Sequence, residues 1–210
     1  MNILNNLPLT KIKISLAKLL YVCVKVFVKG DNHIITRGGI TYQIDLKEGL
    51  DLSLFLFGNF QSHVSRNKYL DLAKDAVVFD IGANVGMMTL QFAQAIPNGK
   101  IFAFEPTHYA LAKLKKNVEL NPHLGSRINV VQTFVTSVEK TDKEIVAYSS
   151  WKVDGTKGER EHPVHQGTAM SAEGVGSITL DDFCENEQVT RIDFIKIENL
   201  YNFDDKPGYS

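Results

Sequence analysis

Apolar residues follow two different patterns along this chain, and the first of them covers its N-terminal part. Between residues 12 and 28 they recur at helical spacing, which predicts a helix, although its β-branched end could also be extended. Two alternating runs on either side of the Gly-Gly pair that begins at Gly38 predict a β-hairpin. Short helices are expected over residues 50–57 and around residues 69–74, the second of them inside a polar linker. We therefore expect residues 1–75 to form an N-terminal extension with a helix and a hairpin.

The second pattern starts at Ala76, where short apolar runs alternate with helix-like segments. This alternation is typical of a parallel sheet whose strands are joined by helices. The expected strands are 77–80, 101–104, 128–135 and 192–197, and the expected helices include 107–120 and 179–184. A poorly patterned segment, 151–176, is expected to be a long irregular loop or a loose hairpin. Right-handed crossovers set the strands in the order 3-2-1-4, so we expect an α/β, Rossmann-like domain over residues 76–210.

Composition and charge narrow the possible functions. The 210 residues suffice for one α/β core, and a net charge of -1 provides no basic surface for DNA or RNA, which argues against a nucleic-acid partner. Cys23 and Cys184 have neither C-x-x-C nor metal-ligand spacing, so we expect free thiols in a reducing compartment. With no signal peptide or membrane span recognisable, we expect a cytoplasmic protein.

Lysines decide how the N-terminal helix is interpreted. Lys13, Lys18 and Lys25 interrupt its apolar sequence, which argues against a membrane-spanning helix. Two interpretations remain. The helix packs on the core or on a second subunit, or it is a basic amphipathic helix that rests on an anionic membrane.

The most specific chemistry lies between residues 76 and 105. The first expected strand ends at Asp80 and leads into a turn that contains Gly82 and Gly86, and the second strand ends at Glu105. A strand, a glycine-containing turn, a helix and a second strand tipped with a carboxylate form a unit that binds a ribose-bearing cofactor. We expect the glycines to let the backbone approach the ligand, and Glu105 to accept two hydrogen bonds from ribose hydroxyls. A strand-to-helix turn without a ligand is the alternative.

The spacing of the glycines favours one cofactor over another. A dinucleotide fingerprint reads G-x-G-x-x-G, and its middle glycine is absent between Gly82 and Gly86. Asp80, two positions ahead of the first glycine, would repel a pyrophosphate but suits the sulfonium and ammonium groups of S-adenosylmethionine. We therefore expect S-adenosylmethionine, and an NAD-dependent oxidoreductase is a distant alternative.

A series of motifs follows in one order along the chain, at residues 37–45, 56–60, 80–86, 104–106, 179–183 and 192–197. Through these motifs the chain resembles the FkbM-type methyltransferases. The likeness runs from about Thr36 to Ile197. It implies a class I S-adenosylmethionine-dependent enzyme that methylates a hydroxyl of a sugar or a natural product, so that the acceptor is a small molecule or a glycan. The cofactor-binding residues expected on this basis are Asp80, Gly82, Ala83, Asn84, Gly86, Glu105 and Pro106.

One departure from that family lies after the fourth strand. The family continues with Asp-x-Glu-Gly, whereas Ile197 is followed by Glu198-Asn199. Glu198 stands in for the first acidic residue and is our candidate catalytic base, and no metal ligands are expected. The family's further strands have no counterpart here, so we expect a sheet that is incomplete at its C-terminal side, as in a truncated enzyme; a cofactor-binding module without turnover is the alternative. The bare edge would expose Phe194, Ile195 and Ile197, which predicts self-association.

Overall fold

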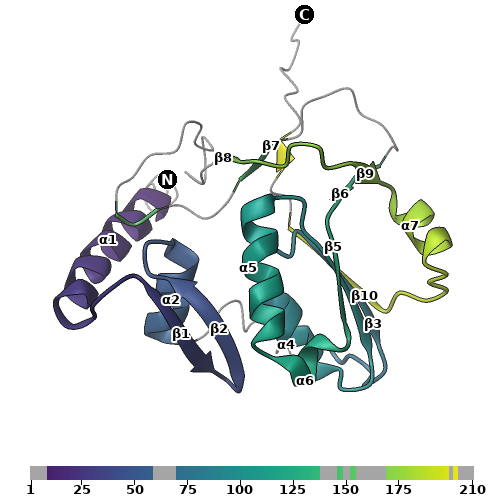
Figure 1. The fold of residues 1–210 in the computed structure, drawn as a ribbon, viewed down its shortest axis with the longest axis horizontal. Helices are drawn as coiled ribbons and strands as arrows, with labels where there is room; N and C mark the ends of the chain where they lie inside the picture. The colour runs from purple at the N-terminus through teal and green to yellow at the C-terminus, as the bar shows by residue number, and fades with distance from the viewer. Residues whose placement is uncertain are drawn as a thin grey trace, which may run out of the picture.

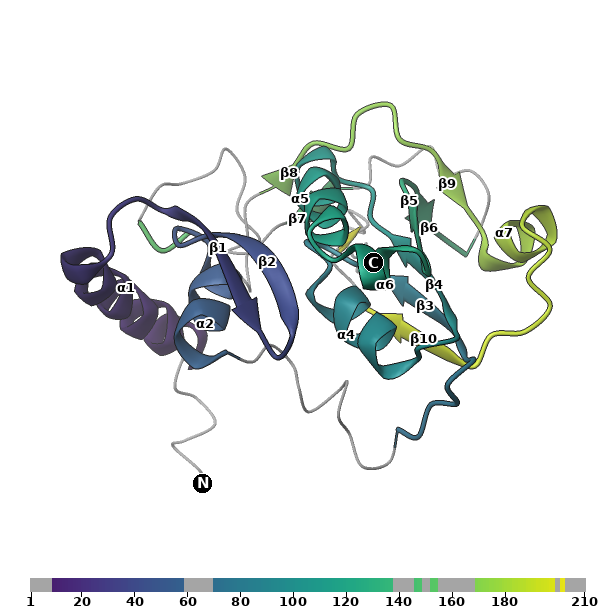
Figure 2. The ribbon, with the colours of Figure 1, turned by 60° about the horizontal axis from the view of Figure 1, so that its bottom comes forward.

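The computed structural model describes residues 9–58, 70–137, 146–148, 152–154, 169–198 and 201–202. Two groups of elements lie side by side in it, the N-terminal extension and an α/β core (Figure 1 and Figure 2). The core holds a parallel sheet with helices on both faces. The expected α/β, Rossmann-like fold class is therefore confirmed.

The extension consists of α1 (Leu9–Phe27), the hairpin of β1 (Asn32–Arg37) and β2 (Ile40–Asp45), and α2 (Gly49–Phe57). The hairpin closes with Arg37 opposite Ile40, and its loop residues Gly38 and Gly39 both have a positive φ, 58° and 82°. Two positive φ angles are what a tight two-residue hairpin loop requires, and glycine adopts them without strain. α2 ends where Gly58 takes the left-handed conformation. The sequence predictions for these four elements are confirmed.

The short helix expected around residues 69–74 was predicted wrongly over its described part. Residues 70–73 have no helical structure, and a turn follows at residues 74 and 75. Leu70 and Leu72 pack against the core while the residue after each is exposed, an alternation that suits an extended segment. Residues 59–69 lie outside the described part of the chain.

The core sheet has four parallel strands in the order β10-β3-β4-β5: β3 (Val77–Ile81), β4 (Lys100–Phe104), β5 (Ile128–Val131) and β10 (Phe194–Ile197). This is the predicted order 3-2-1-4. The first two crossovers run in one direction across the sheet and the third runs back, so right-handed connections put their helices on opposite faces. α4 (Met87–Ala95) and α5 (His108–Glu119), followed by the short α6 (Pro122–Gly125), cover one face, and α7 (Leu180–Asn186) covers the other (Figure 1).

Alternate residues of each strand serve the two faces of this sheet. Phe79, Phe102 and Phe104 point toward α7, where Phe183 packs against all three with ring centroids 5.7, 5.2 and 4.8 Å away. These edge-on contacts are the favoured geometry of aromatic pairs. The opposite face is mostly aliphatic and forms one continuous core with α4, α5 and the extension. The extension therefore completes the same hydrophobic core as the sheet.

The segments between β5 and β10 differ from the prediction in one respect. The strand expected over residues 128–135 breaks after Val131, and its end forms β6 (Phe134–Val135), which pairs with β9 (Ser177–Ile178) outside the main sheet. The break is stabilised by the Thr133 hydroxyl, which donates to the carbonyl of Gly176 (3.0 Å).

The described part of segment 151–176 includes β8 (Ala169–Met170), which pairs with β7 (Val146–Tyr148). On its other side, β7 pairs with β11 (Tyr201–Asn202). Thr179 caps α7, because its hydroxyl accepts the N–H of Asp182 (3.1 Å).

β10 forms one edge of the core sheet within the described residues, where its one neighbour is β3. Ile195 and Ile197, which point to the α7 face, are 38% and 61% exposed. Phe194 is not exposed as predicted, because it points to the other face and packs edge-on against Phe92 at 5.4 Å. Among the described strands none pairs with the outer side of β10, and two apolar side chains are exposed beside it.

We expect the chain to self-associate through β10, since a bare edge with exposed apolar side chains pairs readily with another strand. Replacing Ile197 by Lys places a charge on this edge and should shift the protein toward the monomer. Size-exclusion chromatography with light scattering over a concentration series measures the shift. Ile34→Lys, at an equally exposed position on β1, is the matched control. A wild-type protein that stays monomeric at every concentration would contradict the expectation.

Candidate functional site

The turn that follows β3 carries three residues with a positive φ: Gly82 (73°), Asn84 (51°) and Gly86 (83°). A Cβ on Gly82 would lie 2.7 Å from the carbonyl oxygen of Glu198, and one on Gly86 would lie 2.4 Å from a methyl group of Leu114. The backbone conformation and the contacts within the protein therefore favour glycine at both positions, whether or not a ligand is bound. The contact of these glycines with a cofactor stays a prediction.

The peptide N–H groups of this turn are bound by the end of β4. Gly82 and Ala83 both donate to the carbonyl of Phe104 (3.0 and 2.9 Å), and Asn84 donates to Oε2 of Glu105 (2.8 Å). A loop that cradles phosphates needs such N–H groups to point at the ligand. Since these three are already bonded inside the protein, the turn is poorly suited to a pyrophosphate.

Glu105 lies at the carboxyl end of β4 and is almost fully buried. Its Oε1 accepts hydrogen bonds from the N–H and the hydroxyl of Thr107 (3.0 and 2.6 Å), and its Oε2 accepts the bond from Asn84. Burial raises the pKa of this carboxyl, and the hydrogen bonds counteract part of that effect. Because Oε2 accepts one hydrogen bond within the described part of the chain and has two lone pairs, it keeps capacity to accept another hydroxyl. Pro106, the next predicted site residue, is buried behind it.

Lys196, which the sequence analysis did not single out, joins the two sides of the turn. Its ammonium group lies 2.8 Å from the carbonyl oxygen of Gly82, 3.0 Å from Oδ1 of Asp80 and 3.1 Å from Oε2 of Glu198. Lys196 and Asp80 are direct neighbours in the register of β10 and β3, so their side chains leave the sheet on the same face. Burial alone would lower the pKa of Lys196, but the two carboxylates outweigh it and raise the pKa above its ordinary value.

The ion pair with Lys196 gives Asp80 a role within the protein itself. The sequence analysis assigned its charge to a cationic ligand, but Asp80 is fully buried, and its carboxylate binds Lys196 on one oxygen and the Thr89 hydroxyl of α4 on the other (2.6 Å). A direct role of Asp80 at the cofactor stays a prediction. One signal in the sequence indicated that Lys196 needs a partner: strand alternation sets it on the same face as the apolar Phe194, and a lysine buried there needs a carboxylate.

Glu198, the candidate base, follows β10 directly and is about one third exposed. It lies at an open hollow of about 270 Å³. The hollow is lined by Leu50, Ala83, Asn84, Val85, Met87, Met88, Lys196 and Glu198. The structure thus brings Glu198 to the glycine turn. Asp80 is linked to Glu198 through the Lys196 ammonium, and Glu105 binds the turn at Asn84.

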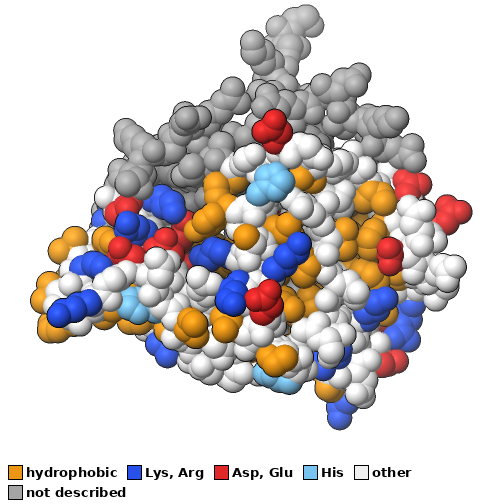
Figure 3. Space-filling view, in the orientation of Figure 1, with side chains coloured by type: hydrophobic (Ala, Val, Ile, Leu, Met, Phe, Trp, Pro, Cys, Tyr) orange, Lys and Arg blue, Asp and Glu red, His pale blue; other side chains and the backbone are white. Residues whose placement is uncertain are grey.

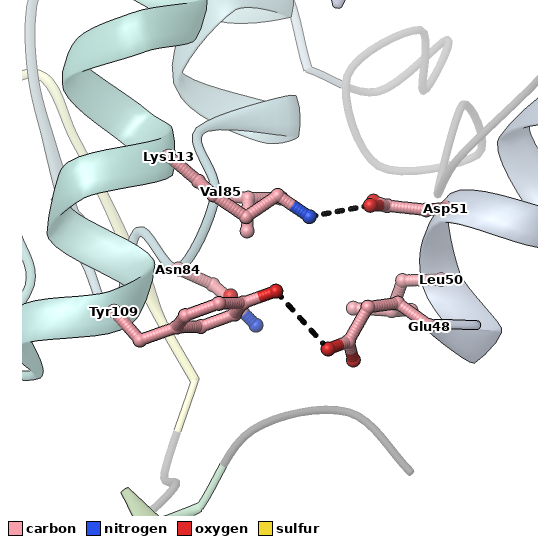
Figure 4. Close-up of a pocket in the computed structure, with 7 residues that line it drawn as sticks. All are labelled: Glu48, Leu50, Asp51, Asn84, Val85, Tyr109 and Lys113. Carbon is pink, nitrogen blue, oxygen red and sulfur yellow. Dashed lines mark hydrogen bonds and ion pairs between the residues drawn. The ribbon is translucent and has the colours of Figure 1, made fainter. Parts of the chain in front are cut away.

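A second hollow, of about 230 Å³, adjoins the first and lies between the extension and α5. Figure 4 shows its lining residues, Glu48, Leu50, Asp51, Asn84, Val85, Tyr109 and Lys113. Both hollows are lined by Leu50 of the extension and by Asn84 and Val85 of the glycine turn. The two hollows therefore have one wall in common.

The two buried carboxylates of the second hollow, Glu48 and Asp51, belong to a charge network that the sequence analysis missed. Asp51 binds the Lys113 ammonium and the N–H of Asp45 (2.7 Å), and Glu48 accepts the Tyr109 hydroxyl (3.2 Å) and pairs with Lys152. Burial raises the pKa of Asp51, and Lys113 opposes that effect. Burial and the nearby Glu48 carboxylate raise the pKa of Tyr109, which keeps its hydroxyl protonated. Periodicity indicated where α2 and α5 lie, but nothing local in the sequence shows that they face each other.

Removing the ammonium of Lys113 should destabilise the protein, because it leaves the buried Asp51 carboxylate without its charged partner. We expect Lys113→Met to lower the free energy of unfolding by about 3 kcal/mol at neutral pH. At a pH well below about 3.9, Asp51 is protonated in both the folded and the unfolded state, so the loss should shrink there. Urea unfolding at both pH values measures it.

Lys116→Met, on the same helix, is the matched control, because Lys116 pairs with Glu119 at the surface and such pairs contribute little. Equal losses in the two variants would show that the pair of Lys113 and Asp51 has no special weight.

Among the described residues, no group of three or more His, Cys, Asp or Glu side chains is placed to hold a metal ion.

Comparison with known proteins identifies related sequences. The family profile of the methyltransferase FkbM domain matches residues 80–198. The AMB antimetabolite synthetase AmbE of Pseudomonas aeruginosa is 36% identical over 73 residues, which make up 35% of this chain and 3% of that protein.

Two solved structures are also similar. The precorrin-6y C5,15-methyltransferase of Geobacter metallireducens aligns with a TM-score of 0.30 and 28% identity, over 33% of this chain and 36% of that one. The FkbM methyltransferase of Methylobacillus flagellatus aligns with a TM-score of 0.33 and 19% identity, over 38% of this chain and 22% of that one. The chain thus spans less than half the length of each of these relatives.

Proposed function

The chain belongs to the FkbM methyltransferase domain family, and from this premise we propose that it transfers a methyl group from S-adenosylmethionine to a hydroxyl of a small molecule or a glycan. The family profile covers the segment that runs from Asp80 to Glu198. One observation carries the proposal: a fixed, buried Glu105 carboxylate lies against a turn whose N–H groups are bonded within the protein. Such a turn favours a nucleoside ligand without a pyrophosphate.

The residues at the turn fit the proposed cofactor. Oε2 of Glu105 is able to accept a ribose hydroxyl, as the carboxylate at the end of the second strand does in Rossmann-like folds. Asn84, Ala83 and Val85 line the hollow in front of Glu198. When bound, S-adenosylmethionine supplies an electrophilic methyl group. The occupied N–H groups of the turn argue against NAD, which carries a pyrophosphate.

Residues around the two hollows suit an acceptor that carries hydroxyl groups. In this proposal the Glu198 carboxylate takes the proton from the acceptor oxygen, and Lys196 holds that carboxylate in place. Asn84 and the polar network of the extension provide donors and acceptors for further hydroxyls. Alignment of the two reactants is the main contribution that a methyl transfer requires from the protein.

A second candidate function is binding of the cofactor without turnover. It is favoured by the engagement of Oε2 of Glu198 with Lys196, because that oxygen already has a partner. The experiment below separates the two functions.

S-adenosylmethionine and S-adenosylhomocysteine should stabilise the protein, and NAD should not. A ligand at 100 times its dissociation constant adds about 2.7 kcal/mol to the free energy of unfolding, which thermal shift or calorimetry detects readily. A panel of sugars and polyols, assayed with S-adenosylmethionine that carries a labelled methyl group, then tests turnover. Stabilisation without label transfer would favour the binding module, and stabilisation by NAD alone would sink the assignment.

Glu105→Gln should weaken binding of S-adenosylhomocysteine at least about tenfold. Hydrogen bonds to a charged acceptor contribute roughly 1.5–3 kcal/mol each, and the amide replaces one carboxylate oxygen with a donor. Gln is preferred to Ala, because Ala would also leave Asn84 and Thr107 without the acceptor they use in the fold. Calorimetry on both proteins measures the change. Glu119→Gln, at an exposed glutamate of α5, is the control, and equal affinities for all three proteins would argue against a ribose contact at Glu105.

A further inference from the structure

α1 is apolar on its outer face as well as on the face that packs inward. The outer residues Leu19, Val22, Val26 and Phe27 are 60%, 61%, 73% and 88% exposed, and Cys23 is exposed between them. They recur every three or four positions, so they form one stripe along the helix, which we call the outer stripe. Solitary exposed apolar residues are common on proteins, but a contiguous stripe of this kind indicates a binding surface.

The inner face of α1 already has its partner. Val24 is buried in the main core, and Ala17, Tyr21 and Val28 pack against that core. Tyr21 also donates a hydrogen bond to Asp31 (3.0 Å). The outer stripe is therefore not needed to attach the helix to the extension. Figure 3 shows hydrophobic side chains at the left edge of the molecule, over α1, with Lys and Arg side chains among them.

The charged residues of the helix itself have one sign. All charged side chains in residues 1–30 are lysines: Lys11, Lys13, Lys18, Lys25 and Lys29. Lys18 and Lys25 are seven residues apart, so they lie along one flank of the stripe, and Lys29 is exposed just after the helix. The first acidic residue is Asp31, and it is paired with Lys25 (2.9 Å) and Lys47 (3.6 Å).

We propose that α1 lies on an anionic lipid surface, with the outer stripe inserted between headgroups and its lysines against the acidic phospholipids. Burial of apolar side chains and attraction of lysines to anionic headgroups are the two contributions that bind an interfacial helix. The helix would rest in the plane of the membrane, because no helix in the described part of the chain is long and apolar enough to cross it. A second copy of the chain is a poorer occupant, since it would bring a second row of lysines against the first.

Sedimentation of the whole chain with lipid vesicles tests this proposal. We expect binding to vesicles of phosphatidylcholine and phosphatidylserine in equal parts, much weaker binding to phosphatidylcholine alone, and loss of binding as salt is raised. The double variant Val22→Glu, Val26→Glu changes two exposed positions, so it should fold normally and bind at least about tenfold more weakly. The double variant Lys18→Glu, Lys29→Glu should lose the preference for phosphatidylserine.

Ile34→Glu is the matched control, because it introduces a carboxylate at an exposed apolar residue of β1, outside both α1 and the β10 edge, and should bind as the wild type does. No binding to phosphatidylserine vesicles, or equal binding by the wild type and the Val22→Glu, Val26→Glu protein, would overturn the proposal. Light scattering without lipid supplies a further check. If the wild type is a dimer that this double variant converts to a monomer, the outer stripe is an interface between copies and the lipid proposal is wrong.

Discussion

The candidate site depends on one buried cation. The Lys196 ammonium binds the Asp80 carboxylate of β3, the carbonyl of Gly82 and the carboxylate of Glu198, so two segments far apart in the sequence meet at a single group. A buried ammonium is costly unless it is paired and hydrogen-bonded, and here its partners supply both conditions. These contacts therefore help to hold the turn in its position beside β10. Gly82 also approaches the Glu198 backbone so closely that a Cβ would not fit between them.

The turn is held from its other side by β4. Glu105 and the carbonyl of Phe104 accept the N–H groups of Gly82, Ala83 and Asn84, so the backbone of the turn is fixed before any ligand arrives. This arrangement leaves carboxylate oxygens and the Asn84 side chain, rather than a row of N–H groups, to meet a ligand. A site of this chemistry suits hydroxyl groups better than phosphates.

The extension contributes residues to the candidate site because it docks beside α5 through hydrogen bonds to polar side chains. Asn117 of α5 and Asn121, just after the end of that helix, accept the N–H groups of Gln43 and Thr41 of β2 (2.8 and 2.9 Å). Beside them, Asp51 meets Lys113 at the wall of the second hollow. The same hydrogen bonds that dock the hairpin thus also bring acidic residues of the extension to the glycine turn.

The sequence by itself determined the elements, the strand order and the location of the turn, since these depend on local periodicity, on residues that tolerate a positive φ and on the handedness of crossovers. It failed where long-range contacts override local preference: β5 ends early because β6 pairs with β9, and Phe194 is covered by Phe92. Tertiary structure alone decided which charges meet. Lys113 and Asp51, 62 positions apart, become partners only because the extension docks on α5, and Asp80 faces Lys196 only because β10 pairs in register with β3. A charge in a sequence shows that a partner is needed, but the fold selects the partner.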